Sequence, residues 1–337
     1  MAAKAGGCVS CGLATAQMGQ TMWQQMHRLR QWASATLMAV LATPALAAAV
    51  CEDPASTMLW QVQGEAPAGR SVSLHLLGSI HVGKADFYPL QPVVDERLQQ
   101  ADTLVFEVDP RSMASPAAAL AIQQRGMLPA DRTLAQELDA ATLATLRQVL
   151  GSLGVPELLV MKMKPWMVTL TLTAVQVQML GYDPANGVES YLMQHKPPAA
   201  AIGELESLDT QLALMESLDQ RVFLNYALQD FASTTAQMEQ LVAAWRCGAH
   251  DQLAEILFSV RDGEANMLPS DRQVLEQVMQ RMFDQRNAHM ATRIDQYLRS
   301  GEGDYFVVVG AGHLLGEGSV VDLLRQRGYD VTPVRQP

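Results

Sequence analysis

Strand-like segments lie near both ends of the region 52–337, and this arrangement limits the folds that are open to the chain. Met58–Gln63 and Ser71–Leu77 are short apolar or alternating runs, and the turn-rich segment Gly64–Gly69 joins them. Thr103–Asp109 and Tyr305–Val309 are further apolar runs. Short runs of this kind between Gly- and Pro-rich turns predict strands. Because distant strands must pair to share one core, we predict an α/β fold with some α+β character around a central mixed sheet.

The long segment between these strands is helical in pattern. Leucines recur near helical spacing from about residue 115 to 297, and only Ala199–Ile202 reads as a short strand there. Pro92–Gln100 and Ser319–Arg327 predict helices beside the sheet, with Ser319 and Asp322 placed as a capping box. We therefore predict a single domain over 52–337, with a helical insertion at about 115–297 and many helices flanking the sheet.

The first 47 residues predict a leader with a cleavable signal peptide. A cationic start at Arg28 and Arg30 precedes an apolar stretch, the helix breaker Pro44, and small residues up to Ala47. This order of charge, apolar core and small residues is typical of export signals. We expect cleavage near Ala47, a periplasmic or secreted protein, and no stable membrane insertion after cleavage.

Several questions about the leader stay open. The true start is Met1, Met22 or Met26. A membrane anchor is one alternative, but the apolar run is mostly alanine and is interrupted by proline. A lipid anchor on Cys51 is another, although Val50 stands where a lipoprotein signal has a small residue.

The charge of the chain excludes one class of partner. The sequence has 35 acidic and 24 basic residues, for a net charge of −11. Removal of residues 1–47 takes away three basic residues and no acidic one, which leaves 21 against 35, or −14. Such a surface has no basic excess to neutralise phosphates, so we expect no nucleic-acid partner. Cys51 and Cys247 remain after cleavage and could form a disulfide; a buried free Cys247 is the alternative.

Two segments share a layout that points to a site. Each is an apolar strand followed at once by Gly-x-x-His, ending at His81 in one case and at His313 in the other. Ligands of α/β sheets bind beyond the carboxyl ends of strands. A neutral imidazole binds metal ions and transfers protons near neutral pH. The alternative is a pair of unrelated loop or packing histidines.

Glu107 supports the first interpretation. It lies in the predicted strand Thr103–Asp109, and a buried carboxylate is costly unless it is paired, protonated or bound to a cation. Together with His81 and His313 it would complete a set of two histidines and one carboxylate, a common protein ligand set of catalytic divalent ions. The alternative is a structural ion pair with Arg286, and both interpretations can hold together.

The sequence offers few other candidates for catalytic residues. Glu206, after the predicted short strand, could act as a general base, and Glu204 competes with it for that role. The sequence has no G-x-S-x-G elbow, Walker loop or dinucleotide fingerprint, which argues against serine hydrolases, NTPases and dehydrogenases. The remaining histidines are interpreted as structural or exposed: His27, His75, His195, His250 and His289.

In these motifs the sequence resembles the TraB/GumN family, whose superfamily includes Tiki-type proteases and, more distantly, erythromycin-esterase-like and ChaN-like proteins. The matching segments cover nearly the whole region after the leader in the expected order: Leu76–Val82, Phe87–Leu90, Ala101–Asp109, Lys164–Trp166, Gly187–Leu192, Ile202–Leu212, Arg286-Asn287, Val308–Leu314 and Arg327–Tyr329.

The resemblance implies a sheet of two related halves, each with one Gly-x-x-His motif. It implies that the metal ligands His81, Glu107 and His313 face one cleft, together with Glu206 and Arg286. It further implies peptide hydrolysis with a divalent metal ion, with manganese or cobalt favoured and zinc also suitable. One departure is the extra carboxylate in Gly203-Glu204-Leu205-Glu206, where the family pattern is Gly-Leu-Glu, so the assignment to Glu206 stays open.

These observations lead to three functional hypotheses. The first is an exported metal-dependent hydrolase, a peptidase above all, in which Glu206 assists water activation and Arg286 stabilises developing negative charge. The second is a metal-free His/Glu esterase. The third is a non-catalytic protein that binds a ligand such as haem or a polysaccharide. The substrate would be a peptide or a small molecule, and the oligomeric state is left open.

Overall fold

The computed structural model describes residues 51–337, apart from 67–69, 230, 232–233, 259–268 and 301–302. The predicted leader therefore lies outside the described residues. Cys51–Pro337 forms one compact unit. Within the described part of the chain, every helix is too short or too polar to cross a membrane.

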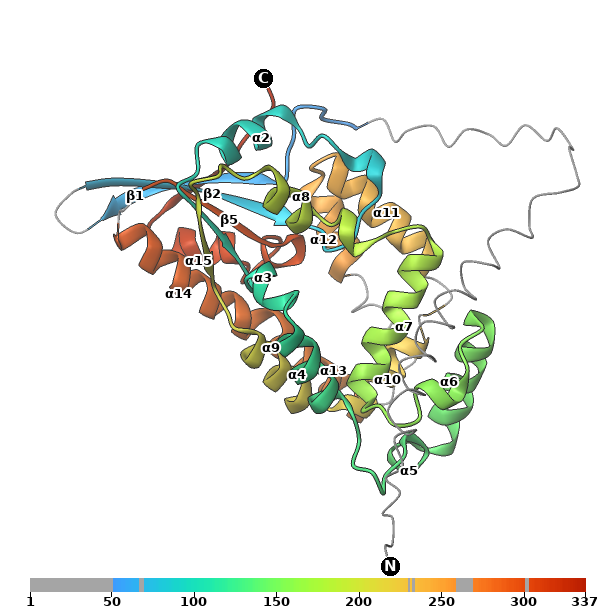
Figure 1. The fold of residues 1–337 in the computed structure, drawn as a ribbon. Helices are drawn as coiled ribbons and strands as arrows, with labels where there is room; N and C mark the ends of the chain where they lie inside the picture. The colour runs from blue at the N-terminus through green and yellow to red at the C-terminus, as the bar shows by residue number, and fades with distance from the viewer. Residues whose placement is uncertain (1–50, 67–69, 230, 232–233, 259–268, 301–302) are drawn as a thin grey trace, which may run out of the picture. The chain divides into compact units, whose positions relative to one another are not determined.

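A mixed sheet with the strand order β4-β3-β5-β2-β1-β6 forms the centre of this unit (Figure 1). Strands β2, β5, β3 and β4 run parallel, whereas β1 is antiparallel to both β2 and β6. The predicted α/β class is confirmed, since segments from both ends of the chain share this sheet. The strands are β1 Leu59–Ala66, β2 Arg70–Ser79, β3 Thr103–Phe106, β4 Ala201–Glu204, β5 Tyr305–Gly310 and β6 Asp330–Pro333.

The strand boundaries differ from the predicted ones in three places. The hairpin of β1 and β2 is longer, because Ala66 still pairs with Arg70; its connection lies outside the described residues. Strand β4 begins two residues later than predicted. Strand β3 ends at Phe106, three residues before the end of the predicted strand Thr103–Asp109, so the prediction that Glu107 lies within a strand is wrong. Asp109 instead accepts a hydrogen bond from the Arg111 backbone N–H and caps the next helix.

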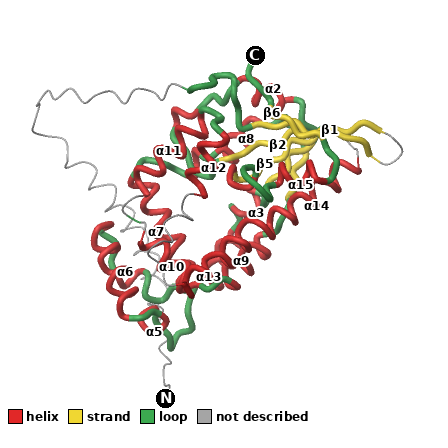
Figure 2. Tube along the Cα trace, turned by 180° about the vertical axis from the view of Figure 1, so that it is seen from behind, coloured by secondary structure: helices red, strands yellow, loops and turns green. Residues whose placement is uncertain are grey.

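Helices cover both faces of the sheet. Figures 1 and 2 show α2 (Pro92–Gln99) on one face, and α14 (Gln285–Ser300) with α15 (Val320–Gln326) on the other. Helix α14 buries Met290, Ala291, Ile294 and Leu298, a spacing that places all four on its sheet-facing side. Helix α15 begins as predicted, because the Ser319 hydroxyl accepts from the Asp322 N–H.

The remaining helices extend from the sheet in a long excursion of the chain between β3 and β5. Some of them, α5, α6, α7 and α10, gather around an apolar core of their own that includes Leu146, Leu172 and Leu224 (Figure 2). The helices of this excursion are α3 Pro110–Met113, α4 Pro116–Gly126, α5 Leu134–Glu137, α6 Ala140–Leu153, α7 Pro165–Met179, α8 Val188–His195, α9 Leu208–Ser217, α10 Gln220–Gln229, α11 Thr234–Arg246, α12 His250–Phe258 and α13 Pro269–Met279.

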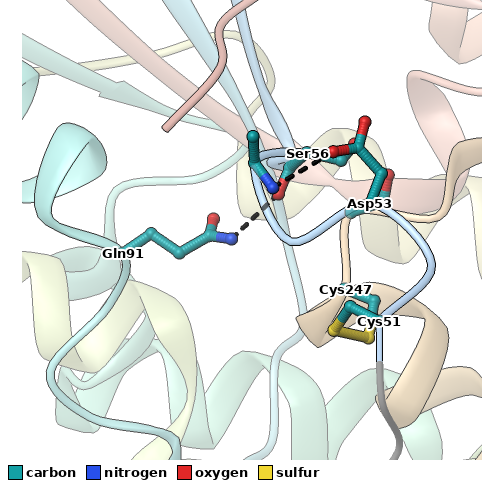
Figure 3. Close-up of a disulfide and its surroundings, with 7 residues drawn as sticks. Cys51, Asp53, Ser56, Gln91 and Cys247 are labelled. Atoms are coloured by element: carbon teal, nitrogen blue, oxygen red, sulfur yellow. Dashed lines mark hydrogen bonds between the residues drawn. A yellow bond between two sulfur atoms is a disulfide. The ribbon is translucent and has the colours of Figure 1, made fainter. Parts of the chain in front are cut away.

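A disulfide joins the start of the unit to the end of α11. Cys51 and Cys247 are bonded across 196 residues of sequence (Figure 3). Next to it, the Ser56 hydroxyl donates to the Gly248 carbonyl at 2.7 Å, and the Gln91 side-chain amide donates to the Ser56 carbonyl at 2.9 Å. The segment before β1 is thus fixed to the helices by a covalent bond and by hydrogen bonds.

Removal of this disulfide is expected to lower the free energy of unfolding by about 2–5 kcal/mol, because the unfolded chain gains the entropy of a long open loop. Urea unfolding of the Cys51→Ser/Cys247→Ser variant, beside the oxidised wild type, measures the difference. A reducing agent should shift the wild-type transition and leave that of the variant unchanged. Equal transition midpoints for the two oxidised proteins would argue against a stabilising disulfide.

Candidate functional site

Four parallel strands end at the same edge of the sheet, and each is followed within three residues by a polar side chain of the predicted site. His81 follows β2, Glu107 follows β3, Glu206 follows β4 and His313 follows β5. The carboxyl edge of a parallel sheet is where α/β proteins bind their ligands. The pairing of these four strands explains how residues more than two hundred positions apart lie together (Figure 1).

Arg286 links the two glutamates of this group. It is the second residue of α14, just after a π-helical segment, Gln280–Asp284. Its Nε lies 3.0 Å from Glu206 Oε2, and its Nη2 lies 2.9 Å from the same oxygen and 2.6 Å from Glu107 Oε2. The predicted ion pair of Glu107 with Arg286 is therefore present. Burial alone raises the pKa of Glu107, but the positive charges around it, with Arg286 in direct contact, hold that pKa well below its usual range.

His313 is the buried histidine of the pair, with 7% of its side chain exposed. Its Nδ1 lies 2.7 Å from Asn287 Oδ1, and Asn287 Nδ2 donates to the Gly318 carbonyl at 3.0 Å, which fixes the orientation of the amide. Nδ1 therefore carries the proton, and Nε2 accepts from Arg286 Nη1 at 3.1 Å. Burial, reinforced by the Arg286 charge, lowers the pKa of His313 to about 4, so this imidazole is neutral at neutral pH.

His81 is the solvent-facing histidine, with 67% of its side chain exposed. Its Nδ1 lies 2.8 Å from Glu189 Oε1, a contact made by a residue of α8. The charge of Glu189 and the hydrogen bond to it raise the pKa of His81 to about 9. The two histidines thus lie in opposite electrostatic environments, although the sequence presents them in the same motif.

Gly310 lies next to Glu107, His81 and His313. Its N–H donates to Glu107 Oε1 at 2.6 Å. A Cβ atom at this position would lie 3.3 Å from Glu107 Oε1, 3.6 Å from His81 Nε2 and 3.7 Å from His313 Cδ2. Glycine at 310 therefore leaves open the space that the Glu107 carboxylate and both imidazoles border.

The sequence predicts a divalent metal ion at this site. Among the described residues, no group of three or more His, Cys, Asp or Glu side chains is arranged to hold a metal ion. The Arg286 guanidinium contacts both His313 Nε2 and Glu107 Oε2. The chemistry of the donors nevertheless fits a divalent ion, because each histidine has Nδ1 held by a partner, which leaves Nε2 as the ligand atom.

Glu204 and Glu206, which the sequence left as competitors, have different surroundings. The Glu206 side chain is 2% exposed and bonded to Arg286 through both oxygens. Glu204 Oε2 accepts from the Asp109 backbone N–H at 3.1 Å and supports the loop after β3. Of Glu204 and Glu206, only Glu206 is thus bonded to Arg286.

His27 falls outside the described residues. The four other remaining histidines lie apart from the site residues. His75 is in β2, where burial lowers its pKa to about 4. The rest bond to backbone carbonyls: His195 to Tyr191, His250 to Thr57 and His289 to Leu205.

Some side chains around the histidines were not singled out from the sequence. Glu189 contacts His81 and is itself bonded by Ser79, and Asn287 contacts His313. The available signal was that Glu189 and Asn287 occupy segments that resemble the family.

Comparison with known proteins agrees with the motifs. The model of the TraB/PrgY/gumN family matches residues 58–333. The chain belongs to this family. The protein YbaP of Escherichia coli K12 is 30% identical over 259 residues, which cover 74% of this chain and 87% of YbaP. No solved structure matches the chain.

Within this TraB/PrgY/gumN family, proteins named as metalloproteases are also similar to the chain. Metalloprotease TIKI2 of Danio rerio is 33% identical over 138 residues, which are 37% of this chain and 26% of that protein. The metalloprotease TIKI homolog of Nematostella vectensis is 29% identical over 155 residues, 40% of this chain and 32% of that protein. The chain therefore spans about a third or less of the length of these two relatives.

Proposed function

We propose that this protein is an exported hydrolase that cleaves peptide bonds at the carboxyl edge of its parallel strands. The observation that carries the proposal is that the Glu107 carboxylate and both imidazoles border the same open space at Gly310. Similarity to proteins named as metalloproteases supports peptides as the substrate class.

In this proposal each residue of the site has a different role. In the absence of a bound ion, His81, exposed to solvent, would meet the substrate and transfer protons through Nε2, while buried His313 stays neutral and oriented. Glu107 Oε1 accepts from the Gly310 N–H and borders the open space at Gly310, whereas both oxygens of Glu206 are bonded to Arg286, so Glu107 is better placed than Glu206 to assist water. Arg286 would stabilise negative charge that develops on the scissile carbonyl oxygen.

A divalent ion would be held by His313 and His81 through Nε2 and by the carboxylate of Glu107. The raised pKa of His81 keeps its ring protonated at neutral pH, so binding of the ion would have to displace the proton on Nε2. When bound, it would supply Lewis acidity toward water and the scissile carbonyl. Arg286 Nη1 now occupies His313 Nε2, and this contact must open before His313 can act as a ligand. Manganese or cobalt is the ion that we propose first, with zinc as the next.

Export is supported by two features of the chain. The leader has the charge, apolar core and small residues of a signal peptide. The Cys51–Cys247 disulfide suits an oxidising compartment such as the periplasm or the extracellular space.

Removal of metal should abolish hydrolysis. Protein from residue 48 onward, dialysed against a chelator, is expected to lose cleavage of a peptide library and to regain it with Mn²⁺ or Co²⁺. Elemental analysis should find less metal bound to His81→Ala and His313→Ala than to wild type.

The contact between Arg286 and His313 favours a second candidate, a metal-free His/Glu hydrolase. Under that alternative, chelation leaves cleavage intact while both histidine substitutions still remove it.

A further inference from the structure

Glu189 holds the exposed histidine of the site. It is the second residue of α8, and one of its oxygens, Oε1, lies 2.8 Å from His81 Nδ1 and 2.5 Å from Ser79 Oγ. Ser79 is 3% exposed, and its hydroxyl donates to this carboxylate. The Glu189 side chain is 21% exposed against 67% for His81, so the carboxylate lies beneath the imidazole.

The backbone of this region brings Glu189 to His81. The Val188 N–H donates to the Ile80 carbonyl at 3.0 Å, and Gly83 and Asp183 exchange two backbone hydrogen bonds of 3.1 and 2.9 Å. The start of α8 is thus paired with the loop that carries His81.

Glycine at position 187 is a condition for this pairing. A Cβ atom there would lie 2.3 Å from the backbone oxygen of His81, closer than any side chain permits. Only glycine lets the end of the preceding loop pass this carbonyl and place Glu189 under the imidazole.

The contact has a chemical consequence. An ionised carboxylate only accepts hydrogen bonds, so Nδ1 of His81 keeps its proton and Nε2 is the nitrogen that borders the open space at Gly310. His313 is held in the same way through Nδ1, but by the neutral amide of Asn287. A carboxylate partner makes the opposite nitrogen more basic than an amide partner does.

We propose that Glu189, supported by Ser79, is a positioning residue that fixes the proton of His81 on Nδ1 and leaves Nε2 for the reaction. Its effect on catalysis rests on the proposed hydrolase function. The position of the proton does not, and it can be measured without a substrate.

The kinetic test uses Glu189→Gln, which keeps the size of the side chain and removes its charge. Its kcat is expected to fall about 10–100-fold, the range for partners of functional histidines, with KM nearly unchanged. Glu189→Asp should recover part of the rate, and Ser79→Ala should show a smaller loss. Gln194→Ala, an exposed position of the same helix, is the matched control.

A double variant decides whether Glu189 acts through His81. Glu189→Gln adds no further loss to His81→Gln if the glutamate works only by holding that imidazole. Losses that multiply, or a Glu189→Gln variant as active as Gln194→Ala, would overturn the proposal.

The second test is NMR of the ¹⁵N-labelled imidazoles, which needs no turnover. Wild type is expected to show a slowly exchanging Nδ1–H signal for His81, and Glu189→Gln is expected to lose that signal or shift it strongly. Persistence of an unchanged signal in the variant refutes the assignment. If this result is as expected while no peptide is cleaved, the proposed hydrolase function fails and the positioning role stands.

Discussion

Replacement of Arg286 by methionine is expected to lower the free energy of unfolding by about 3–5 kcal/mol, because two buried carboxylates lose their shared cation. Arg286 bonds both Glu107 and Glu206, whose side chains are only 11% and 2% exposed. Methionine cannot donate to either carboxylate, so the two buried negative charges would lose the cation that bonds both of them.

Two further variants make this prediction specific. Arg299→Met removes an arginine from the same helix, but its guanidinium is exposed, so its ion pair with Asp295 should contribute much less to stability. Addition of Glu107→Gln and Glu206→Gln to Arg286→Met should restore most of the loss, since no buried charge remains. Denaturant unfolding measures all of them. A loss for Arg286→Met no larger than that for Arg299→Met would mean that the carboxylates do not depend on the guanidinium.

Glu107→Gln is expected to lower kcat for peptide cleavage by about 10²–10⁴-fold, the range for loss of a group that handles protons. The substitution keeps an acceptor for the Gly310 N–H and leaves Arg286 bonded to Glu206. The fold should therefore persist, while the negative charge between the two imidazoles is lost.

The matched control for this prediction is Glu204→Gln. This carboxylate also lies at the end of a parallel strand, but it bonds to the Asp109 backbone rather than to a histidine. Its variant should stay close to wild type in kcat, with thermal unfolding recorded for both variants. Equal rates for Glu107→Gln and wild type would place the chemistry elsewhere.

The sheet and its two histidines could be predicted because their signals are local. An apolar run followed by glycine marks the end of a strand, and the parallel pairing of β2 with β5 then brings His81 and His313 to one edge. The end of β3 could not be predicted in the same way. Val108 continues the apolar run and is itself buried, yet the backbone leaves the ladder after Phe106.

The contacts between distant elements could not be predicted from the sequence pattern. Glu189 lies 108 residues from His81, on a helix whose approach depends on backbone pairing with the histidine loop. Nothing in the local sequence around either residue indicates that pairing. The occupation of His313 Nε2 by Arg286 likewise follows from how α14 packs, which no spacing rule gives.

The most direct measurement of the central claim is digestion of a peptide library by protein from residue 48 onward, with products identified by mass spectrometry. Wild type supplied with Mn²⁺ or Co²⁺ is expected to cleave a defined subset of peptides. His81→Ala at the same concentration should cleave none of them. Saturable ligand binding by wild type without any cleaved peptide, or cleavage that persists in His81→Ala, would contradict a hydrolytic site at this edge of the sheet.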